Sequence, residues 1–167
     1  MRVYVHGNDL LDYFTEKQDP VVVDSDDWTS RQNVKRWLAH YCASQDCEGV
    51  LVWDGTPPGD VRTPSEQFGR VRVTNLPYGE SAFAEISGPA NRTAVQERTF
   101  VVTADHRLIE ALRGGRAAVF TPAQFVARAR RMVGKTDEKL AKEPDEKFTG
   151  LTSDEVEFWL GFFNEKD

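Results

Sequence analysis

Apolar residues are grouped along the chain in two patterns, and each pattern predicts one kind of element. Short apolar runs rich in β-branched residues predict buried strands at 2–5, 50–53, 100–103 and 117–120. The segment 70–74 alternates apolar and polar residues, which is typical of a strand with one exposed face. The short run at 21–23 has two interpretations: an edge strand, or a second candidate for the strand that leads to the site.

Between these strands the apolar spacing changes to that of helices. Residues spaced as one helix face predict a helix that begins near a capping box of Thr29 and Gln32 and ends at Gly49; they are Val34, Trp37, Leu38, Tyr41 and Cys42. Thr121 followed by Pro122 predicts the start of another helix, which we expect to end at Gly134. Shorter helical segments are expected at 10–14, at 80–86 (stopped by 88–89) and around Leu108, Ile109 and Leu112 (stopped by 114–115).

Strands that alternate with helices predict an α/β fold: a doubly wound, mostly parallel five-stranded sheet flanked by helices. We expect this domain to span 1–134. A charged, proline-containing linker follows at 135–147, and a C-terminal helix at 148–167 has aromatic residues on two faces. Such a helix is expected to dock on its own domain or on a protein partner.

Composition limits the classes of function. A length of 167 residues suits one domain, and a net charge of −6 argues against a protein that coats nucleic acid through bulk charge. The two cysteines, Cys42 and Cys47, are expected to be reduced structural thiols. No signal peptide or membrane-spanning run is visible, so we expect a cytoplasmic protein without a membrane partner.

Three polar side chains follow three predicted strands: His6, Asp54 and Asp105. Ligands of open parallel sheets collect at the carboxyl ends of the strands, so these residues are candidate metal ligands and catalytic residues. Glu80 is a fourth candidate catalytic residue, and Asp9 is expected near the same edge. Each also has a structural interpretation: a turn at Asp54, a helix cap at Asp105 and a hydrogen-bonded histidine at His6.

The sequence also resembles a known family. Residues 5–11, VHGNDLL, resemble the opening motif of NYN domains, PIN-like nucleases that include YacP-like bacterial proteins. Residues 50–55, VLVWDG, and 101–105, VVTAD, are similar to later strand-end motifs of that family, and 151–156, LTSDEV, is similar to its tail. The resemblance implies a metal-dependent ribonuclease fold associated with RNA and ribosomes.

Departures from the family pattern put the activity in question. His6 and Asp9 stand where the family has Asp and Asn, and Phe83 and Ala84 stand at an acidic pair. If the site is active, Mg²⁺ or Mn²⁺ is the expected metal, and His6 would favour a transition metal. The resemblance therefore implies a weak or inactive metal-dependent endoribonuclease, or alternatively a non-catalytic module that binds RNA, the ribosome or a protein.

Basic residues are concentrated in the segment 107–135. We predict RNA-phosphate contacts at Arg107, Arg128, Arg130 and Arg131, since a local basic face on an acidic protein still binds phosphates. The alternative interpretation is an ordinary solvated helix face. A protein partner held by the C-terminal aromatic helix is the third alternative.

Overall fold

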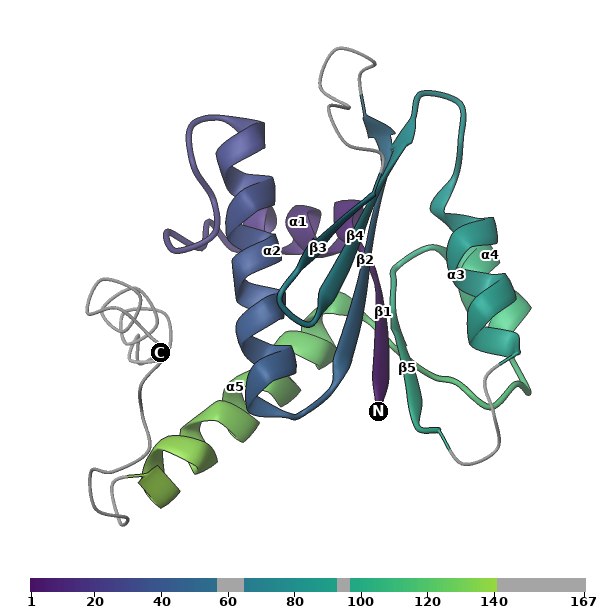
Figure 1. Ribbon diagram of the computed structural model, residues 1–167. Coiled ribbons are helices and arrows are strands. Elements are labelled where there is room, and N and C mark those ends of the chain that lie inside the picture. Colours follow the sequence, from purple (N-terminus) through teal and green to yellow (C-terminus); the bar gives the residue numbers. More distant parts are fainter. Residues whose placement is uncertain (57–64, 93–96, 141–167) are drawn as a thin grey trace.

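The computed structural model describes residues 1–56, 65–92 and 97–140, which form a six-stranded sheet with helices on both faces (Figure 1). The strand order is β3-β4-β2-β1-β5-β6. The strands are β1 (Arg2–His6), β2 (Glu48–Thr56), β3 (Ser65–Phe68), β4 (Val71–Pro77), β5 (Thr99–Val102) and β6 (Ala118–Phe120). All neighbours are parallel except β3, which pairs antiparallel with β4. The predicted class is confirmed, with β3 as an additional strand.

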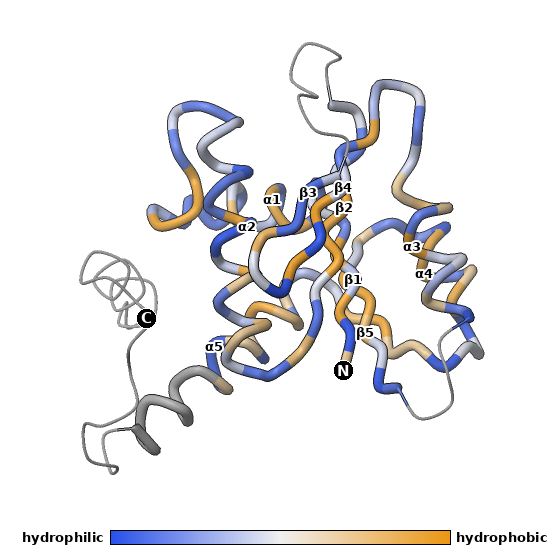
Figure 2. The backbone as a smooth tube through the Cα atoms, in the orientation of Figure 1, coloured by the Kyte–Doolittle hydropathy of each residue, from blue (hydrophilic) through white to orange (hydrophobic). Residues whose placement is uncertain are grey.

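The helices form one layer on each side of the sheet. They are α1 (Gly7–Glu16), α2 (Asp27–Ser44), α3 (Ala82–Asn91), α4 (His106–Leu112) and α5 (Pro122–Leu140). Figure 1 shows α1, α2 and α5 on one side and α3 with α4 on the other. Each side has its own apolar core, centred on Phe14, Trp37 and Phe125 in the first and on Ile86, Leu108 and Leu112 in the second. Figure 2 shows hydrophobic residues concentrated in the central strands, while the helices combine hydrophobic and hydrophilic residues.

Strand β1 lies in the middle of the sheet and positions the site. It pairs in parallel with β2 and with β5, so that Val5 is opposite both Leu51 and Val102. Strands β1 and β5 therefore end within one residue of each other, while β2 continues past them to Thr56. The residues that follow them meet at one edge of the sheet, as the sequence predicted.

Several local predictions are wrong. Helix α2 ends at Ser44, and Gly49, which was expected to end it, lies in β2. The segment 21–23 is no strand: Val21 and Val22 lie in a turn, in which Asp19 accepts a hydrogen bond from the Val21 N–H, and Val22 is buried in the core. Helix α2 begins at Asp27, because the Asp26 carboxylate accepts from the Thr29 N–H and caps the helix before the expected box. Helix α3 includes Gly88 and Pro89, which were expected to end it.

Helix α5 also continues past Gly134, its predicted end, to Leu140. The rest of the predicted linker and the whole predicted helix at 148–167 lie outside the described residues. Both cysteines are free and buried, as predicted. No helix in the described ranges is long and apolar enough to cross a membrane.

Candidate functional site

The site forms where β1 passes directly into α1. His6 is the last residue of β1 and Gly7 the first of α1, so no loop separates them. A Cβ on Gly7 would lie 2.6 Å from two atoms of the Trp53 ring, which only glycine avoids. The close approach of α1 to β2 places the first turn of the helix against the strand end that carries Asp54.

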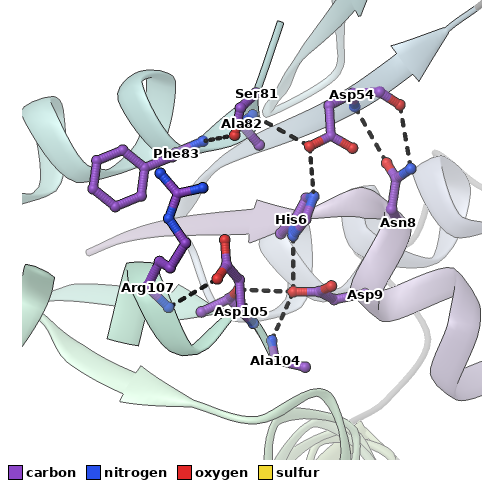
Figure 3. A network of polar contacts seen from close by, with 11 residues as sticks. His6, Asn8, Asp9, Asp54, Ser81, Ala82, Phe83, Ala104, Asp105 and Arg107 are labelled. Atoms are coloured by element: carbon purple, nitrogen blue, oxygen red, sulfur yellow. Dashed lines mark hydrogen bonds and ion pairs between the residues drawn. The ribbon is translucent and has the colours of Figure 1, made fainter. Parts of the chain in front are cut away.

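The His6 imidazole lies between two carboxylates (Figure 3). Its Nδ1 is 2.8 Å from Asp9 Oδ2 and its Nε2 is 3.2 Å from Asp54 Oδ2. The Nδ1 contact is short but does not have hydrogen-bond geometry, so we describe it as an ion pair. The side chain of His6 is only 11% exposed, and the two aspartates are 16% and 24% exposed. Both ring nitrogens therefore face acids in a largely water-excluded position.

Asp9 joins α1 to the segment that follows β5. Its Oδ2 accepts a hydrogen bond of 2.7 Å from the Thr103 hydroxyl and one of 2.6 Å from the Ala104 N–H. Burial favours the neutral acid, but the contacts with His6, Thr103 and Ala104 outweigh it and lower the pKa of Asp9 to about 2. Asp9 is therefore ionised throughout the physiological pH range.

The same contacts act on His6 in the opposite direction. Burial is the largest single influence on the pKa of His6 and lowers it, while the neighbouring carboxylates of Asp9 and Asp54 raise it. The net effect is a raised pKa for His6. The site thus favours an imidazolium between two carboxylates.

Asp54 is fixed by its backbone as well as by its side chain. The Asn8 side chain donates to the Asp54 carbonyl and accepts from the Asp54 N–H, both at 3.2 Å. The Asp54 Oδ2 also accepts a 3.3 Å hydrogen bond from the Ala82 N–H at the start of α3. These bonds occur where the β2–β4 register shifts, between Trp53 and Thr56. Asp54 therefore lies within β2 rather than after it, and it connects three elements.

Asp105 lies on the other side of β1, after β5. Its Oδ1 accepts a 2.8 Å hydrogen bond from the Arg107 N–H and caps α4, while its own N–H donates to the Thr103 hydroxyl. The structure therefore brings His6, Asp54 and Asp105 to one edge, and the alternative capping role of Asp105 is also present. Glu80 does not join this network: its side chain is exposed, and its N–H bonds to Pro77.

Sequence reasoning missed four contributors to the network: Asn8, Ala82, Thr103 and Ala104. Asp9 was expected near the edge, but its direct pairing with His6 was not. The spacing of Asp9 three residues after His6 carried that signal, because side chains at i and i+3 are neighbours once a helix begins at the strand end. The roles of Ala82 and Ala104 depend on backbone N–H groups, which no side-chain pattern reveals.

These residues do not fit a Mg²⁺ centre. A hard divalent cation needs several oxygen ligands. Here one oxygen each of Asp9 and Asp54 faces the imidazole and also accepts a backbone hydrogen bond, and one oxygen of Asp105 caps a helix. Within the described ranges, no group of three or more His, Cys, Asp or Glu side chains is arranged to hold a metal ion.

The predicted RNA-binding arginines do not share one surface. Arg128 is half-buried on α5, with its guanidinium 5.6 Å and 5.9 Å from the ring centres of Phe100 and Phe120. Arg130 forms a 3.1 Å ion pair with Asp19, and Arg131 is exposed. Arg107 is on the opposite helical layer, beside the site.

Arg107 is the predicted arginine nearest to the His6 network (Figure 3). Its guanidinium lies 5.5 Å from the centre of the Phe83 ring. The Arg107 side chain is exposed and forms no ion pair with a residue of the described ranges. Arg107 and Phe83 therefore present a cationic and aromatic pair at the rim of the site.

The fold is an open α/β sheet with acidic and imidazole groups near the carboxyl ends of β1, β2 and β5, where sheets of this class bind their ligands. Within this class the chain belongs to the YacP-like NYN domain family, whose model matches residues 14–158. The predicted family is confirmed.

Solved structures support the same fold. The chain is similar to Rae1 (YacP) from Bacillus subtilis, with a TM-score of 0.61 and 14% identity over 85% of this chain and 80% of that one. A mutant of the same protein gives a TM-score of 0.58 and 13% identity over 84% and 82%. No curated protein sequence matches the chain.

Proposed function

We propose that this chain is an RNA-associated YacP-like NYN domain whose endoribonuclease activity is weak or absent. The observation that carries the proposal is the position of the His6 imidazole between Asp9 and Asp54. An imidazolium there supplies, from the chain itself, positive charge that would otherwise come from a metal. It also occupies carboxylate oxygens that a metal would need.

RNA association follows from charge and from family membership. When His6 is protonated, it offsets one of its two neighbouring carboxylates, so that a phosphate approaching the rim meets less repulsion. Arg107 and the Phe83 ring stand beside this rim and offer a cation and a stacking surface. Single-stranded RNA is the substrate class that this combination suits, since stacking on an aromatic ring needs an unpaired base.

The test combines cleavage and binding. Purified protein is incubated with single-stranded and structured RNA in Mg²⁺, Mn²⁺ or Zn²⁺, and Asp54→Asn and Asp105→Asn serve as controls. We expect binding that weakens steeply with salt, and little or no cleavage. Rapid Mg²⁺-dependent cleavage that both substitutions abolish would refute the proposal, whereas cleavage that survives both would indicate a contaminant.

The binding surface is tested with a matched pair of arginines, Arg107 in the first turn of α4 and Arg113 at its C-cap. Arg107→Gln should weaken RNA binding severalfold. Arg113→Gln, at the other end of the helix and paired with Glu110, should not. If both variants bind RNA as tightly as the unsubstituted chain does, the rim is not part of the RNA-binding surface.

A transition-metal endoribonuclease is the second candidate function. It is favoured by one observation: the His6 imidazole lies beside the Asp54 carboxylate, and Asp105 follows β5, the strand on the other side of β1. Zn²⁺ or Mn²⁺ accepts nitrogen ligands more readily than Mg²⁺ does. Cleavage in Zn²⁺ or Mn²⁺ alone, lost in His6→Gln, would select this candidate.

A further inference from the structure

A groove lies on the sheet away from the His6 network. Helices α3 and α4 pack on one face of the sheet, and α3 contacts β1, β2 and β5. The part of this face formed by β3, β4 and the start of β2 is hollowed into an open groove of about 420 Å³. Its principal side chains are Arg2, Glu48, Val50, Gln67, Arg70 and Arg72. The β3–β4 turn lies at the opposite end of β4 from the loop that leads to α3 (Figure 1).

Strand alternation places these side chains on one face. Val71 and Val73 of β4 point into the core beneath α2, so Arg72 between them points to the other side of the sheet. The strand register then sets Arg72 beside Val50 and Gln67, and Arg2 beside Glu48. Arg70 precedes β4, in the turn after β3, and also lines the groove.

The groove is positively charged on an acidic protein. Three arginines line it against one carboxylate, that of Glu48. Arg2 is held by Glu48 at 2.8 Å and by Glu97 at 3.5 Å, which fixes its guanidinium at the end of the groove. Arg70 has a 2.8 Å contact with Asp46 through one nitrogen only, and that carboxylate is 85% exposed.

Of the three arginines that line the groove, Arg72 is the one whose guanidinium is not held by a neighbouring carboxylate of the described residues. It is exposed, and it forms no ion pair with any residue between 1 and 56, 65 and 92 or 97 and 140. Its neighbours on the two adjacent strands are Val50 and the polar Gln67, and neither carries a charge that would pair with the Arg72 guanidinium. Two guanidinium groups that line the same groove can hold one phosphate from two sides or contact successive phosphates of a strand.

We propose that this groove binds a phosphate group, with Arg70 and Arg72 as its principal ligands. The phosphate belongs either to a small phosphate-bearing molecule or to the backbone of a nucleic-acid strand. Planar guanidinium groups match the oxygens of a phosphate bidentately, and Gln67 adds an amide donor beside them. The site is separate from the rim at His6, so it exists whether or not that rim contacts RNA.

Binding is measured by two-dimensional amide NMR of the full chain, with inorganic phosphate in one titration and a short single-stranded oligonucleotide in the other. We expect the Gln67, Gly69 and Arg72 amides to shift. The Arg70→Gln, Arg72→Gln double variant should lose affinity by about tenfold or more, as expected for two phosphate contacts at low salt. Arg36→Gln, an exposed arginine on α2 on the other side of the sheet, is the matched control.

A second substitution separates binding from misfolding. Glu48→Gln removes the one carboxylate that lines the groove and should tighten binding severalfold, a gain that an unfolded variant cannot give. Shifts with phosphate alone would support a small ligand, and shifts only with the oligonucleotide, with a steep salt dependence, would support a strand. Absence of shifts in both titrations, or equal affinity in the double variant, would overturn the proposal, while failure of Arg107→Gln to affect RNA binding would not bear on it.

Discussion

The imidazole of His6 and the carboxylate of Asp54 face each other across two neighbouring parallel strands, with Nε2 3.2 Å from Oδ2. Parallel register alone brings the two strand ends together, and the Asn8 side chain then fixes the Asp54 backbone in place. Because Asp9 contacts the other ring nitrogen, the imidazole links α1, β1 and β2. Four predictions follow from this network and the residues around it.

Replacing the imidazole should create a metal response. In His6→Asp, three carboxylates of β1, α1 and β2 would repel one another, so the melting temperature should fall and Mg²⁺ should restore it. A ligand at a hundred times its dissociation constant adds about 2.7 kcal/mol to the free energy of unfolding. The unsubstituted chain should show no such shift in a thermal-shift assay.

The control for this prediction is Asp105→Asn added to His6→Asp, since an asparagine still accepts the hydrogen bond that caps α4. The double variant should respond less to Mg²⁺ than His6→Asp does. If Mg²⁺ does not change the melting temperature of His6→Asp, the acids at this edge are too far apart to bind a common ion.

Stability should depend on pH through the same pair. The pKa of His6 is raised, so its contribution is complete below about pH 6.5, the usual value, and is lost as pH rises through the folded-state value. The pKa of Asp9 is lowered to about 2, so its contribution is complete above about pH 4 and is lost as pH falls toward 2. The pair is most stabilising between these limits.

Urea unfolding at a series of pH values measures this dependence. In His6→Gln the loss of stability on the alkaline side should flatten, and the acid side should shift to higher pH because Asp9 loses its cationic neighbour. An unchanged pH profile in His6→Gln would contradict the assignment of an imidazolium at this position.

Asp9 should matter more for stability than its exposed neighbour. Asp9→Ala leaves the Thr103 hydroxyl and the Ala104 N–H without their acceptor and removes one of the two carboxylates beside His6, which should cost about 2–3 kcal/mol. Asp12→Ala, exposed on the same helix, should change stability by less than about 0.5 kcal/mol. Chemical denaturation of the two variants decides; equal losses would mean that the Asp9 contacts contribute nothing specific.

Gly7 should tolerate no side chain. In Gly7→Ala the new methyl group would overlap the Trp53 ring, which should cost about 1–3 kcal/mol and displace the first turn of α1. Trp53→Phe removes the overlapping ring atoms, so the double variant should be less destabilised than the sum of the single variants. Additive losses in thermal denaturation would show that the two residues do not compete for this space.

The sequence predicted the parts of the fold that local chemistry decides. Thr121 and Gln124 exchange hydrogen bonds at the start of α5, as expected of a hydroxyl cap followed by proline. The apolar runs of β1, β2 and β5 predicted both the strands and the meeting of His6, Asp54 and Asp105, because parallel strands bury both faces and end at one edge.

What it missed depends on tertiary context. The segment 21–23 has the composition of a strand, but Val22 is buried from a turn held by Asp19. Pro89 fits within α3 although it was expected to stop it. The strand β3 has no apolar pattern of its own, since three of its four residues are exposed and it is defined by pairing with β4. The tethering of Asp9 to Thr103 spans 94 residues and leaves no local signal.

The central place of β1 has a consequence for how the protein is made. This strand is synthesised before both of its hydrogen-bonded neighbours, and one of them ends only at Val102. Until β5 is synthesised, the edge of β1 that pairs with it is exposed and can form only non-native strand pairs. Parallel pairing between strands far apart in the sequence also forms slowly. Premature truncation anywhere before β5 should therefore yield an aggregating fragment rather than a smaller folded unit.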